Sequence, residues 1–585
     1  MVFAILPHRC KKSKGTRGIL IFCYSLLMET TLRRIVDSAL IDLFNLSEVS
    51  YSIEHPKELA HGDYAINVAL VVSKELGKNP KEIADQLANY IDTHKGLMIT
   101  SVQVAGPGFI NITMAREVFI EKLAQIQAEG ASWGHTSVYA GKKVVVEHSS
   151  PNLFKPFHIG HLMNNTFGEA ITRLAKGSGA EVVTLSFPSD ISLGVAKAVF
   201  VLLEKNYTPD DLTIKLLGDA YVEGTKRYEE DESIQVRVKE IADNLYAQTP
   251  SAEWDLFQVC KKLNIEYFES IVTKLGSAFD GYIFESEAGV DGKRLVLEHT
   301  PGVFIESEGA IVYTPDESKK LHTAVFINSQ GNPTYEAKDL GLLHLKFAQY
   351  NPDISIVITD NQQTSHFQVV VDAAGKITPV WESNSLHRST GRMAFKGQKM
   401  SSRLGGVPLV EDILATVAGE VQEKNPDVSN CIAEMIGIAA LKFAILRAMA
   451  GKDINFDPET SLSFEGDSGP YLQYTAVRAA SVLTKGLAEE ITPDVSHPVG
   501  GSEILERLIA RFPEVVALAQ SEWMPHYIVG YLIELAQAFN SWYGQHKIID
   551  DSKEGSAYRL AVVAATRQTI VNGLDILGIA VPEKM

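Results

Sequence analysis

Hydrophobic positions recur at two different spacings along the chain. Short apolar runs bounded by turn residues occur at 144–146 (VVV), 181–187 (EVVTLSF) and 354–359 (ISIVIT), and a helical pattern follows the first of them. This alternation predicts buried parallel strands linked by helices, with ligands at the carboxyl ends of the strands. From about residue 409 to residue 585 the apolar positions fall at helical spacing on broad faces, which predicts a helical bundle.

Two further regions depart from that sheet pattern. Residues 28 to about 134 predict a small α+β unit, with helices over 29–45 and 79–95, a capped helix over 62–70 and a strand-turn-strand over 102–115. Residues 195–300 predict mostly helix, and strands with turns return at 302–314 and 322–340. The predicted fold class is therefore α/β. We expect a small α+β N-terminal domain at 28–135, a Rossmann-type parallel-sheet domain at 136–408 with a helical insertion at about 195–300, and an α-helical bundle at 409–585.

The first 27 residues have a pattern of their own. A basic stretch at 11–17 (KKSKGTR) precedes an apolar run at 18–27 (GILIFCYSLL), which imitates the charged and apolar regions of a signal peptide. The apolar run is too short to cross a bilayer as a helix, which takes about 20 residues. Because an amphipathic pattern begins at Met28, we interpret residues 1–27 as a non-structural extension rather than as an export signal.

Composition narrows the class of protein. The chain has 585 residues, of which 45% are hydrophobic and 22% are charged, as in soluble globular proteins of several domains. Four scattered cysteines without a CxxC pair argue against a disulfide framework or a zinc knuckle, and they fit a reducing cytoplasm. The formal net charge of −18 is unfavourable for nucleic-acid binding, so any RNA site must be a local basic surface.

The stretch EHSSPNLFKPFHIGH (147–161) carries the first candidate chemistry. It follows a predicted strand and leads into a predicted helix that carries His158 and His161 on one face at its N-terminal end. Free backbone N–H groups there attract phosphate, Gly160 removes a side chain that would block close approach, and two imidazoles can donate to phosphate oxygens. The other interpretation is an ordinary strand-loop-helix crossing with two surface or core histidines.

A second candidate stretch, KGQKMSSRLGG, lies far downstream at 396–406. Glycines stand near both ends, and basic side chains surround the hydroxyls of Ser401 and Ser402. Such a loop can close over a triphosphate and offset the charge that builds up during nucleotidyl transfer. By itself the stretch is more typical of an ordinary solvated basic loop.

Together the two stretches resemble the HIGH and KMSKS elements of class I aminoacyl-tRNA synthetases. The resemblance narrows to arginyl-tRNA synthetases, because EHSSPN, ESEGA, GNPTYEAKDL, NQQTSHF and KMSSR occur in that order and cover the catalytic half of the chain. It implies catalytic roles for His158, His161, Lys155 and Lys399. It implies ATP binding by His158, Gly160, His161, Lys155, Lys399, Met400, Ser401 and Ser402. The fourth KMSKS position holds Ser402 instead of lysine, and the resemblance implies that Lys155 stands in for it.

The same resemblance implies an arginine site made of Glu147, Asn152, Tyr335, Asp339 and Gln363. The chemistry of these residues agrees, because a guanidinium is a planar fork of donors that two carboxylates and an amide oxygen can satisfy. Tyr335 and Asp339 are four apart on a predicted helix and therefore share a face. The other interpretation of the two acids is ordinary helix capping or surface charge.

Two tRNA surfaces are implied as well. Phe109 and Asn111 follow a Gly-Pro-Gly turn, and an aromatic face beside an amide suits an unstacked base of the tRNA elbow. In the predicted anticodon-binding bundle, aromatic and cationic side chains that suit bases and phosphates come from Tyr471, Gln473, Tyr474 and Arg478. The other interpretations are a core hairpin phenylalanine and tyrosines packed between helices.

The expected reaction is the ATP-dependent ligation of L-arginine to tRNA(Arg) through an arginyl-adenylate, with Mg²⁺ accompanying ATP and no protein-ligated metal. We expect tRNA(Arg), L-arginine and ATP as partners, no membrane, and a monomer in the cytoplasm. The alternatives are another class I synthetase, or a non-catalytic tRNA-binding paralogue if either motif were degenerate. Paired acids argue against glutamate as the substrate, and the lack of a cysteine cluster argues against cysteine. At 188–194 the family's GDWG stretch is replaced by PSDISLG, which keeps only Asp190 and leaves acceptor-end contacts there open.

Overall fold

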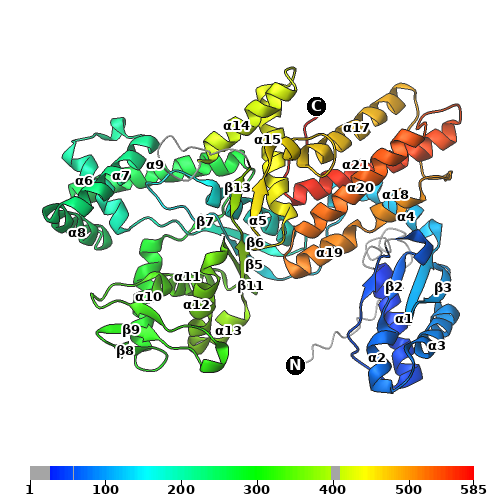
Figure 1. Cartoon of the computed structure of the whole chain (residues 1–585), viewed down its shortest axis with the longest axis horizontal. Helices are drawn as coiled ribbons and strands as arrows, with labels where there is room; N and C mark the ends of the chain where they lie inside the picture. The colour runs from blue at the N-terminus through cyan, green and yellow to red at the C-terminus, as the bar shows by residue number, and fades with distance from the viewer. Residues whose placement is uncertain (1–26, 57, 397–408) are drawn as a thin grey trace, which may run out of the picture. The chain divides into compact units, whose positions relative to one another are not determined.

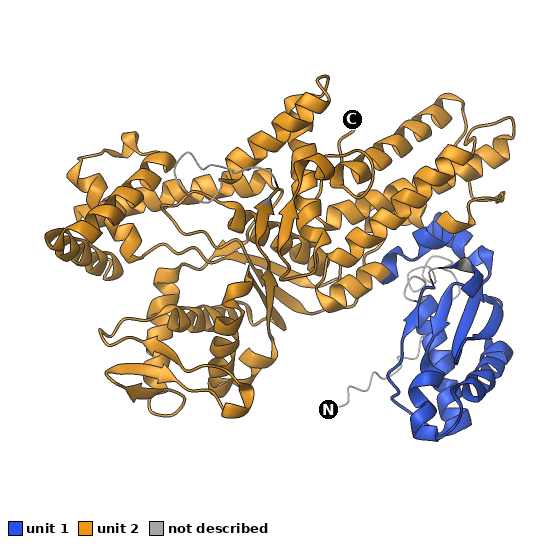
Figure 2. Ribbon diagram, viewed as in Figure 1, with its two compact units in different colours: residues 1–125, 506–514 blue, residues 126–505, 515–585 orange. Residues whose placement is uncertain are grey.

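The structure, a computed structural model, describes residues 27–56, 58–396 and 409–585. The predicted N-terminal extension therefore lies outside the described residues apart from its last position. The same holds for the KMSKS-like residues Lys399, Met400, Ser401 and Ser402. The chain forms two compact units, residues 1–125 with 506–514 and residues 126–505 with 515–585 (Figure 2).

The smaller unit is a four-stranded antiparallel sheet in the order β1-β2-β4-β3, packed with helices. Its strands are β1 (Ile53–Glu54), β2 (Tyr64–Ile66), β3 (Ile99–Ala105) and β4 (Phe109–Met114), and its helices are α1 (Leu27–Phe44), α2 (Val68–Leu76), α3 (Pro80–His94) and the first part of α4 (Arg116–Glu129). The helix predicted over 62–70 needs correction, because Tyr64 and Ile66 pair with β4 and bury their side chains in the core. The helix begins only at Val68.

A segment from far along the chain, residues 506–514, belongs to this unit. Arg116 donates to both carboxylate oxygens of Glu506, at 2.8 and 2.7 Å, and Glu506 is fully buried. Arg507 donates to buried Asp63 at 2.7 Å. A bidentate arginine–carboxylate pair is among the strongest and most directional of protein ion pairs, so these contacts fix where the segment attaches.

The larger unit contains the predicted parallel sheet, with five strands in the order β12-β11-β5-β6-β7 (Figure 1). The strands are β5 (Lys143–Glu147), β6 (Glu181–Ser186), β7 (Gly281–Tyr282), β11 (Ile354–Asp360) and β12 (Ser385–Thr390). The three valines of β5 are fully buried between its neighbours, as expected for a strand covered on both faces. Helix α5 (Ile159–Lys176) connects β5 to β6, so the predicted βαβ arrangement is confirmed.

The chain between β6 and β11 forms a run of helices, then a small antiparallel sheet, and then one more helix. The helices are α6 (Leu193–Glu204), α7 (Ile214–Glu230), α8 (Glu232–Tyr246), α9 (Ala252–Lys274), α10 (Glu285–Glu298) and α11 (Tyr335–Tyr350), and the strands are β8 (Ile305–Ser307), β9 (Ala310–Tyr313) and β10 (Ala324–Ile327). Gly292 lets α10 approach α11 closely, because a Cβ there would lie 1.8 Å from the carbonyl oxygen of Ala337. This contact orients α11, which carries several predicted site residues.

The remaining elements are mostly helical, as predicted from residue 409 onward. They are α12 (Thr364–Ile377), α13 (Pro379–Ser383), β13 (Met393–Phe395), α14 (Val410–Lys424), α15 (Asn430–Arg447), β14 (Ile454–Phe456), α16 (Pro458–Ser461), α17 (Gly469–Ala488), α18 (Glu503–Ala510), α19 (Phe512–Glu522), α20 (His526–Gln545) and α21 (Lys553–Ile576). Buried Lys442 on α15 donates to the carbonyl oxygens of Leu275 and Gly578, just beyond the ends of α9 and α21. Helix C-termini carry partial negative charge, which stabilises this buried ammonium. Within the described residues, no helix is long and apolar enough to cross a membrane.

Candidate functional site

Two histidines cap the N-terminus of α5. His158 is the residue before the first turn, and its Nδ1 accepts from the Gly160 N–H at 3.1 Å. Nδ1 of His161 accepts from the His158 N–H at 3.3 Å, and the two rings stack with centroids 3.8 Å apart. Because both Nδ1 atoms accept, each ring carries its proton on Nε2 and retains an N–H donor for a ligand.

Both histidines are held neutral. Burial lowers the pKa of His161 to about 3, and the nearby His158 and Lys155 contribute in the same direction. Burial and Lys155 also lower the pKa of His158. A Cβ at position 160 would lie 3.1 Å from the His158 ring, so Gly160 gives the ring room over the helix end. The pair therefore offers an anion dipolar N–H groups and a helix terminus rather than positive charge.

The loop between β5 and α5 is strained and well anchored. Ser149 and Phe154 have left-handed backbones, with φ of 58° and 64°. Phe154 is buried, and its N–H donates to Asn264 at 3.0 Å. Such strain persists only where surrounding contacts impose it, and it is concentrated at functional sites. Lys155 next to it is exposed, with its ammonium 4.6 Å from the centroid of the Tyr221 ring.

The end of β5 carries a buried ion pair. Glu147 is 3% exposed, and Lys346 of α11, 1% exposed, donates to its Oε2 at 2.6 Å. Burial raises the pKa of Glu147, Lys346 opposes the rise, and Asp339 adds to it. The two acids predicted to bind one cation therefore lie near enough for one charge to act on the other.

Asp339 also has a cationic partner. His366 on the first turn of α12 donates from Nε2 to Asp339 Oδ2 at 2.5 Å, and its Nδ1 lies 3.5 Å from Glu336 Oε1. Burial lowers the pKa of His366, but the hydrogen bonds to Asp339 and Glu336 outweigh that effect and raise it to about 9. Neither His366 nor Lys346 was among the predicted site residues. The two acids three apart at the start of α11 indicate that a cation is needed there, and His366 lies within the NQQTSHF stretch.

The other predicted arginine contacts lie in the loops that follow β5 and β11 and at the start of α11. Asn152 is exposed in the loop after β5 and bridges through its backbone to Ser189. Gln363 is exposed in the turn that follows β11. Tyr335 begins α11 and is 70% exposed, with the Lys338 ammonium 5.3 Å from its ring centroid.

The predicted tRNA contacts differ in accessibility. In the smaller unit, Phe109 is 38% exposed and shares one face of β4 with half-buried Asn111. On α17, Arg478 donates to Asn540 at 2.6 Å and to the Tyr474 hydroxyl at 3.0 Å, and Tyr471 is half-buried. Gln473 is fully buried and donates to the carbonyl oxygen of Ala580 at 2.6 Å. This burial corrects the expectation for Gln473, because a fully buried side chain cannot contact tRNA in this structure.

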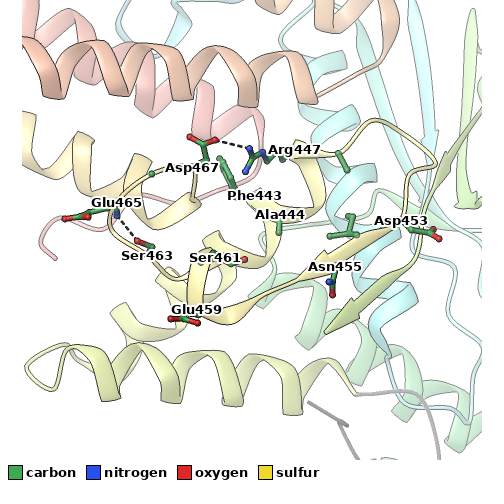
Figure 3. Close-up of a pocket in the computed structure, with 14 residues that line it drawn as sticks. Phe443, Ala444, Arg447, Asp453, Asn455, Glu459, Ser461, Ser463, Glu465 and Asp467 are labelled. Carbon is green, nitrogen blue, oxygen red and sulfur yellow. Dashed lines mark hydrogen bonds and ion pairs between the residues drawn. The ribbon is translucent and has the colours of Figure 1, made fainter. Parts of the chain in front are cut away.

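A separate pocket of about 890 Å³ lies among the end of α15, β14, α16 and the loop before α17 (Figure 3). Arg447 and Asp467 form an ion pair of 2.9 Å at its wall, and Asp453, Glu459 and Glu465 also line it. Acidic side chains disfavour a nucleotide phosphate. Among the described residues, its lining includes none of the predicted site residues.

Three family descriptions match the chain. "Arginyl tRNA synthetase N terminal domain" matches residues 30–114, "tRNA synthetases class I (R), catalytic domain" matches residues 122–457, and "DALR anticodon binding domain" matches residues 472–585. The catalytic-domain match extends beyond the boundary at 408 that the sequence pattern suggested.

Whole-length relatives agree with these matches. The arginine–tRNA ligase of Clostridium perfringens is 30% identical over 565 residues, which cover 93% of this chain and 98% of that one. The arginine–tRNA ligase of Bacteroides thetaiotaomicron is 27% identical and covers 94% and 100%. The solved structure of Thermus thermophilus arginyl-tRNA synthetase is similar in fold, with a TM-score of 0.79 at 24% identity over 95% of this chain and 100% of that one. Fold, motif order and sequence similarity agree along nearly the whole length, and the chain therefore belongs to the arginyl-tRNA synthetase family of class I aminoacyl-tRNA synthetases.

Proposed function

We propose that this chain is an arginine–tRNA ligase that works in two steps. The carboxylate of arginine attacks the α-phosphorus of ATP, forming arginyl-adenylate as pyrophosphate leaves. A hydroxyl of the terminal ribose of tRNA(Arg) then attacks the arginyl carbonyl, forming the ester as AMP leaves. One observation supports this proposal above the others. β5 ends at Glu147 in the acid cluster and leads within the same loop to the histidine-capped helix end, so a cation site and an anion site share one edge of the sheet.

Within this proposal, His158 and His161 donate hydrogen bonds from Nε2–H to phosphate oxygens of ATP, and Gly160 keeps the helix end open. Lys155 is exposed beside them and supplies the positive charge that the neutral histidines lack. Lys399, Met400, Ser401 and Ser402 are assigned to the same phosphates on the resemblance of their motif. The adenylate is already reactive, so positioning and electrostatic stabilisation suffice for catalysis.

Mg²⁺ enters as part of the nucleotide substrate. Among the described residues, no group of three or more His, Cys, Asp and Glu side chains is arranged to hold a metal ion. Mg²⁺ is commonly held by substrate phosphates with few protein ligands, and its contribution is to neutralise phosphate charge.

The arginine side chain is assigned to Glu147, Asn152, Tyr335, Asp339 and Gln363. Two carboxylates and amide oxygens match the five N–H donors of a guanidinium, whereas the ammonium of lysine would leave acceptors unpaired. Buried polar groups left unpaired by a wrong substrate can give discrimination of roughly 10⁴ without editing. We assign Phe109 and Asn111 to the tRNA elbow, and Tyr471, Tyr474 and Arg478 to the anticodon arm.

We further propose that the chain acts as a monomer in the cytoplasm. We propose domains at 28–135, 136–408 and 409–585, with a helical insertion at about 195–300. The cytoplasmic location follows from the substrates, since ATP and tRNA are intracellular.

The proposed function is tested by arginine-dependent ATP–pyrophosphate exchange with a panel of amino acids, with and without total tRNA. We expect arginine to be the only amino acid of the panel that supports exchange, and we expect this exchange to require tRNA. Labelled arginine should also be transferred to tRNA. Exchange with a different amino acid would identify another class I specificity. Binding of tRNA without exchange or charging would identify a non-catalytic paralogue.

A further inference from the structure

Asp339 is held in place before any substrate arrives. Its Oδ2 accepts from His366 at 2.5 Å, and the same imidazole contacts Glu336 one turn earlier on α11. His366 comes from α12, so the contact joins the two helices that flank the predicted arginine site. A carboxylate bound through one oxygen cannot rotate freely, and its other oxygen, Oδ1, keeps a defined position.

The charges around this carboxylate nearly balance. Three acids, Glu147, Glu336 and Asp339, face two cations, Lys346 and His366, in contacts of 2.5 to 3.5 Å. Burial is the main cause of the raised pKa of Glu147, and the negative charge of Asp339 adds to it. Each of the two acids has its own cationic partner. With all five groups ionised, the cluster carries one unit of negative charge, which one guanidinium neutralises.

His366 is the protonated imidazole of the cluster, because the groups around it favour its positive charge. Asp339 and Glu336 contact it from α11, and the charge of His366 also acts on His387 of β12. Burial, with the charges of Arg388 and His366, lowers the pKa of His387 to about 4, so that ring is neutral at pH 7. His387 instead contacts Thr359 and stacks on Phe367.

We propose that His366 is a positioning residue for arginine: it occupies Oδ2 of Asp339, holds the carboxylate against α12 and leaves Oδ1 to accept from the substrate guanidinium. This proposal rests on the proposed role of Asp339 in arginine binding. His366 itself does not touch the substrate. A histidine suits the task because both ring nitrogens can donate, one to each acid, when the ring is protonated.

The test compares His366→Ala and His366→Gln with Asp339→Asn and with the double variant His366→Ala with Asp339→Asn. The control is His344→Gln. His344 lies on α11, as Asp339 does, and pairs with Asp291, so the control removes a histidine–aspartate contact away from the cluster. KM for arginine, KM for ATP and kcat are measured by aminoacylation. For His366→Ala we expect KM for arginine to rise about 10- to 100-fold, the scale of one charge-assisted hydrogen bond, with KM for ATP changed less than about threefold.

Two comparisons separate a positioning role from a structural one. Gln can still donate one hydrogen bond, so His366→Gln should recover part of the loss, and His344→Gln should match the unmodified protein. Because His366 acts through Asp339, the double variant should be no worse than Asp339→Asn alone. Equal rises in the two KM values, or multiplied losses in the double variant, would overturn the proposal for His366. An unchanged KM for arginine in Asp339→Asn would instead overturn the arginine site on which it rests.

Discussion

Replacing Lys346 with methionine should destabilise the larger unit in a way that depends on pH. Lys346 is 1% exposed and its ammonium lies 2.6 Å from Oε2 of Glu147, which is itself 3% exposed. Methionine keeps most of the side-chain volume but removes the charge. Glu147 then remains buried beside Asp339, without the lysine that now opposes the rise of its pKa.

The size of the effect has an upper limit, because Glu147 can escape the penalty by binding a proton. The ordinary pKa of this carboxyl is 4.5, which is about 2.5 units below pH 7. Binding a proton at pH 7 therefore costs about 3.4 kcal/mol, at roughly 1.36 kcal/mol per pH unit. At about pH 5 the same step costs only about 0.7 kcal/mol. A folded-state pKa raised above the unfolded value gives stability that is present at low pH and lost as pH rises. The destabilisation should therefore shrink by about 2 to 3 kcal/mol between pH 7 and pH 5.

Equilibrium urea unfolding at several pH values between about pH 5 and pH 7.5 measures this difference. The transition of the larger unit is compared between the unmodified chain, Lys346→Met and Lys346→Met with Glu147→Gln. The double variant removes both charges, so it should recover most of the stability and lose the extra pH dependence. A destabilisation of equal size at pH 5 and pH 7, or one that persists unchanged in the double variant, would refute the reasoning.

Three further outcomes are expected. Lys155→Ala should reduce arginine-dependent pyrophosphate exchange by roughly 10²-fold while tRNA binding, measured by filter retention, changes little; unchanged exchange would remove Lys155 from the mechanism. Because burial holds the pKa of His161 at about 3, the exchange rate at saturating substrates should show no ionisation of His161 between about pH 6 and pH 8. A step at about pH 6.5 that disappears in His161→Asn would contradict this. Gly168→Ala should lower the thermal midpoint by an amount equivalent to about 1 to 3 kcal/mol, because the new Cβ would lie 2.2 Å from the His148 ring. The matched change Gly419→Ala, on α14 with open space around it, should be neutral or stabilising, and equal losses in both variants would contradict the steric explanation.

Local patterns in the sequence were enough to predict the parallel sheet and the helix that starts at the histidine pair. The buried valines of β5 and the apolar spacing after His158 each act within a few residues, where backbone geometry and side-chain periodicity decide the outcome. The order of the motifs along the chain was likewise sufficient to predict the family. These features depend on neighbours in sequence, so they can be read without coordinates.

Which residues pair with one another, in ion pairs and between strands, was decided only by the tertiary structure. The cation beside Glu147 comes from a position 199 residues away, and the one beside Asp339 comes from a different helix. The strand at 64–66 exists because β4 pairs with it, although the local pattern favours a helix. Residues 506–514 join the smaller unit through ion pairs to residues about 390 and 444 positions earlier.

The burial of Gln473 shows the same division at a single residue. Its polar side chain among aromatic and basic neighbours favoured a surface contact, but packing against the end of the chain buries it. Its Nε2 donates to the carbonyl oxygen of Ala580, whereas its Oε1 has no hydrogen-bond partner among the described residues. A buried polar group can pair only where the folded chain supplies a partner, and leaving it unpaired costs free energy. The sequence therefore determined the helices and strands and the functional side chains on them, and long-range packing determined which charged groups form ion pairs.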